Sequence, residues 1–147
     1  MLELVRVSVC PKPEMVAVVN AGLEALCTHI RYPADKTRRL QLATEEIFLY
    51  ALNTIRKANL RSILTVRFRS HANGFQIVVE YVGPRGELDG YLKPGQLQSL
   101  KVNGFDAVGL CLAANVLDYL KSTYWTVEGI NCYLLSQSFP RSKNLST

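Results

Sequence analysis

Apolar residues follow two different spacings along the chain. At every second position they predict β-strands, and at positions three and four apart they predict helices. The alternating segments are 2–10, 59–70, 75–82, 122–127 and 130–139, and the helical ones are about 13–30, 36–57 and 106–121. The order β-α-α-β-β-loop-α-β-β predicts an α+β fold, namely a two-layer sandwich with a mostly antiparallel mixed sheet and helices on one face.

Turn-forming residues indicate how these segments connect. Asn73-Gly74 separates two alternating segments and is a strong hairpin signal. Residues 83–106 are rich in Gly, Pro and Asp, and a connection of that length in a compact domain is usually functional or mobile. We therefore expect 83–106 to be the least ordered internal stretch. We assign 1–139 to one domain and 140–147 to a polar tail that frays.

Composition narrows the class of protein more than its function. With 147 residues, 48% of them hydrophobic and 20% charged, the chain fits one globular domain. We expect no membrane partner and a cytoplasmic location, because no apolar run approaches the roughly 18 residues of a membrane span and no leader pattern is present. The four cysteines form no CxxC pair, which favours buried free thiols over a zinc site. The net charge of +5 suits an acidic partner or a nucleic acid and decides neither.

Two adjacent carboxylates, Glu45 and Glu46, interrupt the otherwise apolar stretch LATEEIFLYALNTI at 42–55. They have two readings. Both could lie on a solvated face of the helix, which is the common arrangement for charged helical residues. Alternatively, they are what remains of a site that held a metal and a nucleotide.

Glu46 belongs to the first of three short motifs. These read EEIFLY at 45–50, VEYVGP at 79–84 and AVGLCL at 107–112. Together with the element order, they resemble the GHKL (Bergerat-fold) ATPase domain over about residues 1–139, and most closely the small anti-sigma factor serine kinases of bacteria. The resemblance implies a nucleotide pocket between helix 36–57, the strand that ends near 82, and the third helix.

In the helical motif, the resemblance places Glu46 at the position of the family's base. Tyr50 stands where the family has an Asn that binds magnesium, and a neutral phenol is a poor ligand for that ion. Asn53 lies about two turns after Glu46 on the same stripe and offers an oxygen, although roughly one turn from the expected place. We expect Tyr50 to be buried beneath residues 83–106 and Glu45 to be mostly exposed.

The other two motifs likewise keep some of the family's residues, but other positions carry side chains with different chemical properties. Tyr81 stands at the family's adenine-binding Asp, while Gly83 is kept. In the phosphate-binding loop Gly109 and Leu110 are kept, but Ala107 replaces the first glycine. A Cβ at that position restricts positive φ and crowds the approach of phosphate to the helix N-terminus. The two tyrosine rings would occupy volume that a nucleotide needs.

These departures favour a degenerate switch-kinase-like domain that acts as a regulatory protein-binding module and uses no cofactor. By resemblance, its partner would be a sigma factor or an anti-sigma-antagonist domain. The alternative is an active serine protein kinase that binds ATP and magnesium, with Glu46 as its base. A nucleic-acid module using Arg67 and Arg69 is disfavoured, because aromatic and basic residues do not interleave. The sequence leaves open the identity of the partner and whether the chain forms a homodimer.

Overall fold

The computed structural model describes residues 2–86, 88, 90–93 and 108–139. The chain forms three α-helices, a short 3-10 helix and six strands within these ranges. Their bounds are β1 Leu2–Val9, η1 Pro13–Met15, α1 Val16–His29, α2 Ala34–Lys57, β2 Leu64–His71, β3 Gly74–Val82, β4 Gly90–Tyr91, α4 Val108–Val116, β5 Tyr119–Trp125 and β6 Ile130–Ser138.

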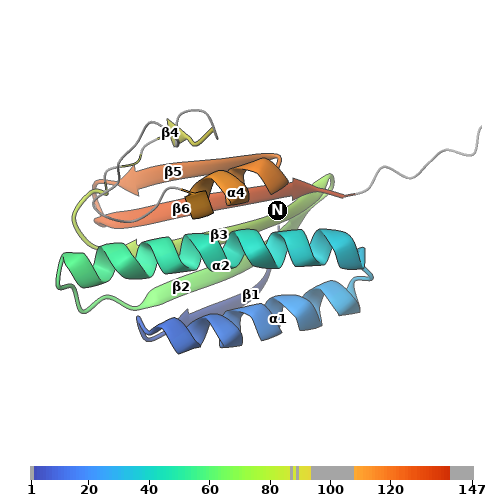
Figure 1. The fold of residues 1–147 in the computed structure, drawn as a ribbon, viewed down its shortest axis with the longest axis horizontal. Coiled ribbons are helices and arrows are strands. Elements are labelled where there is room, and N and C mark those ends of the chain that lie inside the picture. Colours follow the sequence, from blue (N-terminus) through green and yellow to red (C-terminus); the bar gives the residue numbers. More distant parts are fainter. Residues whose placement is uncertain (1, 87, 89, 94–107, 140–147) are drawn as a thin grey trace, which may run out of the picture.

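The six strands form one sheet in the order β1-β2-β3-β6-β5-β4, and α1, α2 and α4 cover a single face of it (Figure 1). The predicted α+β fold with two layers is confirmed. Every pairing between the described strands is antiparallel, whereas the prediction allowed for a mixed sheet.

The connections explain this strand direction. Two antiparallel helices, α1 and α2, join β1 to β2, so the chain reverses three times and β2 returns antiparallel to its neighbour. A tight turn joins β2 to β3, as the Asn73-Gly74 signal predicts. Gly74 is required there for a second reason, because a Cβ on it would lie 2.5 Å from the backbone oxygen of Gln137 on β6.

The two faces of the sheet differ in character. On β2, Leu64, Val66 and Phe68 face the helices and are fully buried, while the residues between them face away from the helices. The central strand β3 is buried on both faces, and Val78 on the side opposite the helices is only 1% exposed. The main core therefore lies between the helices and the sheet, with α2 at its centre.

Three local predictions need correction. The third helix ends at Val116 rather than near residue 121, because the Asp118 carboxylate accepts a hydrogen bond from the Ser138 backbone N–H at 2.6 Å and β5 already begins at Tyr119. The stretch 83–106 contains a strand, β4, which pairs with β5. The prediction of buried thiols is wrong for Cys10, which is exposed, and only partly right for Cys132.

Within the described ranges, none of the helices combines the length and the apolar character that a membrane crossing requires.

Candidate functional site

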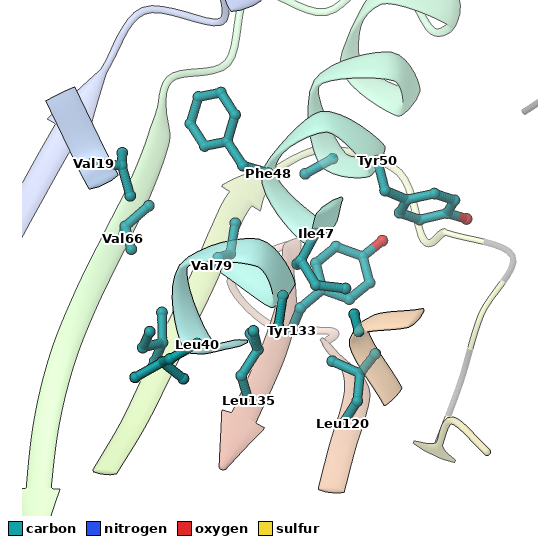
Figure 2. Packing of buried hydrophobic residues seen from close by; sticks show 14 of the residues in the cluster. Val19, Leu40, Ile47, Phe48, Tyr50, Val66, Val79, Leu120, Tyr133 and Leu135 are labelled. Carbon is teal, nitrogen blue, oxygen red and sulfur yellow. The ribbon is translucent and has the colours of Figure 1, made fainter. Parts of the chain in front are cut away.

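Helix α2 carries the first motif over the middle of the sheet. Ile47 and Phe48 are fully buried in the core beneath it (Figure 2). Tyr50 is 3% exposed, so its predicted burial is confirmed, while most of the segment 83–106 that we expect to cover it lies outside the described residues. Glu45 and Glu46 are both half-buried, and the expectation that Glu45 is mostly exposed is therefore wrong. Because both carboxylates are half-buried, their burial does not decide between a solvated helix face and the remains of a nucleotide site.

Three buried tyrosines meet where α2, the end of β3 and β6 converge, and we call them the tyrosine cluster: Tyr50, Tyr81 and Tyr133. The rings of Tyr50 and Tyr133 make an edge-to-face contact with their centroids 5.8 Å apart. Tyr81 is 2% exposed and Tyr133 is 1% exposed. A Cβ placed on Gly86 would lie 3.7 Å from the Tyr133 hydroxyl and 3.9 Å from that of Tyr81, so both hydroxyls approach this glycine.

Sequence reasoning selected Tyr50 and Tyr81 but missed Tyr133, which contacts Tyr50 and lies beside Tyr81. The sequence carried only an indirect signal for Tyr133. Tyr133 pairs with Val79, and Tyr81 pairs with Asn131, so Tyr81 and Tyr133 share the helix-facing side of neighbouring strands. That relation depends on β6 lying next to β3 although about fifty residues separate them in the chain.

Two hydroxyls of the cluster, those of Tyr81 and Tyr133, have raised pKa values. Burial raises the pKa of Tyr81, and it raises the pKa of Tyr133 far above the usual tyrosine range, with Tyr81 and Tyr50 adding to the effect. The Tyr81 hydroxyl is fully buried and makes no hydrogen bond of good geometry, although the hydroxyls of Tyr133 and Thr54 lie close to it. A buried, poorly bonded hydroxyl costs free energy, so ring packing must hold this cluster together.

The Glu46 carboxylate lies directly against the start of α4. A Cβ on Gly109 would lie 2.0 Å from Oε2 of Glu46 and 2.9 Å from its Cδ. Two motifs that are about sixty residues apart thus meet, and Gly109 is required by the approach of a side chain from α2. Burial raises the pKa of Glu46, and the adjacent Glu45 raises it further. The structure thus brings the Glu46 carboxyl group to the start of α4.

This contact predicts strong coupling between the two positions. We expect Gly109→Ala alone to lower the free energy of unfolding by about 1 kcal/mol, because the new methyl group displaces the Glu46 side chain. In a Glu46→Ala background the same substitution should be neutral or stabilise by up to about 1 kcal/mol, because alanine is the better helix former. Urea denaturation of the four proteins in the cycle measures this, and additive effects would contradict the contact.

Asn131 holds the beginning of the segment that follows β3. Its side-chain oxygen accepts a hydrogen bond from Gly86 N–H at 2.8 Å, and its amide donates to the carbonyl oxygens of Pro84 at 2.9 Å and Gly83 at 3.4 Å. Sequence reasoning did not select this residue. The expectation that 83–106 is poorly ordered falls mainly outside the described residues, and the part described at 83–86 is tied to β6.

The side chains at two positions that the resemblance gives to a magnesium nucleotide are large and buried. Tyr50 is 3% exposed and Tyr81 is 2% exposed, and a Cβ on the kept Gly83 would lie 3.5 Å from the Tyr81 ring. Leu110 is fully buried in the core, and Asn53 is half-buried on α2. Among the described residues no group of three or more His, Cys, Asp or Glu could hold a metal ion. Ala107 lies outside the described residues.

An open pocket of about 460 Å³ lies near the first turn of α2, where the α1–α2 connection meets β1 and β2. Its lining includes Leu4, Tyr32, His71 and Phe139. Glu46 follows the first residue of α2 by 12 residues, or about 18 Å along the helix. The lining contains no residue of the three motifs, so this pocket is distinct from the motif site.

Comparison of the sequence with protein-family profiles and with curated proteins finds no match.

Proposed function

We propose that this protein is a regulatory protein-binding domain, related to the GHKL serine kinases, whose nucleotide site is filled by its own side chains. The observation that carries the proposal is the tyrosine cluster, which places three nearly fully buried rings where the resemblance expects a nucleotide. By the same resemblance, the partner is a sigma factor or an anti-sigma-antagonist domain.

Two further features support this proposal. The element order β-α-α-β-β-α-β-β agrees with the family pattern apart from the short β4. Glu46 of the first motif lies against Gly109 of the third, so two of the motifs meet as the resemblance implies. A nucleotide at these motifs would have to displace the buried side chains of Tyr50 and Tyr81, so activity through a partner requires less rearrangement than activity through ATP.

The test is nucleotide binding by the unmodified protein. We expect no change in the melting temperature at millimolar ATP and magnesium, and no saturable heat in a calorimetric titration. A ligand at a hundred times its Kd would stabilise the fold by about 2.7 kcal/mol, which is easily detected.

The variant Glu46→Gln shows where any bound nucleotide lies. Saturable binding whose affinity changes in Glu46→Gln would place ATP beside Glu46 at the motifs and favour the alternative, an ATP-binding serine kinase. Binding whose affinity is unchanged in Glu46→Gln would place the nucleotide away from Glu46, for example in the pocket near Tyr32. The first result contradicts the proposed function, because it requires an open motif site, and the second leaves the motif site filled.

A further inference from the structure

A row of apolar side chains crosses the sheet on the face that the helices leave open, and we call it the end row: Ile63, Val82, Ile130 and Trp125. The pairings Val82 with Ile130 and Ile130 with Trp125 place three of them side by side. Continuing the β2–β3 register by two residues places Ile63 beside Val82, and the Ser62 hydroxyl donates a hydrogen bond to the Val82 carbonyl oxygen.

The end row is unusually exposed for large apolar side chains. Ile63 is 57% exposed, Val82 is 58% exposed and Trp125 is 57% exposed. All described helices lie on the opposite face of the sheet (Figure 1). Single exposed apolar residues are ordinary, but these three and the partly buried Ile130 lie in one row across neighbouring strands and form a contiguous patch, and such patches mark interaction sites.

The rest of the open face is basic. It carries four basic side chains and two acidic ones, namely Arg6, Arg67, Arg69 and Lys121 against Glu3 and Glu80. Arg67 is paired with Glu80 at 2.9 Å, and the Lys121 ammonium lies 5.1 Å from the centroid of the Tyr91 ring. The two acidic groups are thus already engaged by arginines, and the face keeps an excess of two positive charges.

We infer that the end row is the docking surface for an amphipathic helix of a partner protein, with an apolar stripe flanked by acidic residues. Four neighbouring strands place the ends of the row about 14 Å apart, and ten to eleven helical residues span that length. Four anchors spaced three or four residues apart would meet the four side chains. A helix about 10 Å wide would bring one flank toward Lys121, two rows further in, and toward Arg67 in the same row, which is paired with Glu80.

The composition of the face argues against other occupants. A second copy of this chain would place two basic faces against each other. Single-stranded nucleic acid needs aromatic platforms, but three of the four side chains in the end row are aliphatic. The inference rests on the proposed function in so far as the protein acts by binding another protein, and it specifies the surface and the chemistry of that partner.

The test uses a designed helical peptide of about 14 residues with leucines at i, i+4, i+7 and i+11 and glutamates on both flanks. Trp125 is the only tryptophan in the chain, so its fluorescence reports directly on the end row. We expect a saturable blue shift with the acidic peptide, and binding at least about tenfold weaker for the same apolar stripe flanked by lysines. Raising the salt concentration should reduce that difference, because exposed charges are screened.

Two substitutions test whether peptide binding requires the end row or only an exposed apolar residue anywhere on the protein. Val82→Asp, in the end row, should weaken peptide binding by about tenfold or more. Val18→Asp is the matched control, because Val18 is 49% exposed on α1 in the other layer, and it should leave binding unchanged. Circular dichroism and urea denaturation of both variants verify that they remain folded. Ile63→Ser provides a second end-row variant if Val82→Asp does not fold.

Several results would overturn the inference. They are equal binding of acidic and basic peptides, an unchanged affinity of the end-row variants for the peptide, and a shift in the fluorescence of Trp125 caused by oligonucleotides. Self-association that Val82→Asp abolishes would assign the row to a second copy of the chain. Since nucleotide binding is measured separately on wild type and Glu46→Gln, peptide binding without ATP binding supports both proposals. Failure of either measurement identifies which proposal is wrong.

Discussion

The free energy of unfolding is expected to fall steeply above pH 10. Tyr32, Tyr81 and Tyr133 are all buried, and burial raises the pKa of each in the folded protein. In the unfolded chain they ionise near the ordinary value of about 10. The unfolded state therefore releases protons that the folded state retains. The stability linked to these groups is complete below pH 10 and is lost as pH rises.

The expected slope approaches about 1.4 kcal/mol per pH unit for each tyrosine, or roughly 4 kcal/mol per unit for the three together. Urea denaturation at a series of pH values from 8 to 11 measures the slope, and absorbance at 295 nm reports tyrosine ionisation. The share of the absorbance change that belongs to three of the seven tyrosines should appear only with unfolding. Tyr133→Phe should remove about one third of the slope, and ionisation of all seven tyrosines while the protein remains folded would contradict the burial of the cluster.

Replacing Tyr133 by alanine is expected to lower the free energy of unfolding by about 3–5 kcal/mol. The side chain is 1% exposed, packs edge-to-face on Tyr50 and lies beside Tyr81, so its removal leaves a cavity inside the cluster. A loss of that size is a large fraction of the typical stability of a domain, about 5–15 kcal/mol. Chemical denaturation with an unchanged m-value would measure it.

Two controls separate the sources of this effect. Tyr133→Phe keeps the ring and removes only the hydroxyl, so its cost should be much smaller. Trp125→Ala removes an aromatic ring from the same hairpin at a position that is 57% exposed, and it should change stability by less than about 0.5 kcal/mol. Similar losses for Tyr133→Ala and Trp125→Ala would show that the cluster contributes no special packing.

The sequence alone was sufficient for most of the fold. Hydrophobic spacing located α1, α2 and the two long hairpins, because each pattern reports which face of a local element is buried. It failed at the end of the third helix, where Leu117 and Leu120 fit helical spacing but lie on a bend and on β5. It also missed β4, because a two-residue strand has no period to detect.

The candidate site likewise contains residues that the sequence identified and residues whose role only the structure revealed. The sequence identified Glu46, Tyr50, Tyr81 and Gly109 as positions of interest. A motif position can be recognised from its neighbours even where its own side chain differs from that of the family. Only the tertiary structure showed that Tyr133 completes the tyrosine cluster, that Asn131 holds residues 83–86, and that Glu46 lies against Gly109. The end row likewise appears only when strand pairing brings Ile63, Val82, Ile130 and Trp125 together. These relations depend on contacts between distant segments, and local spacing carries no information about which strands become neighbours.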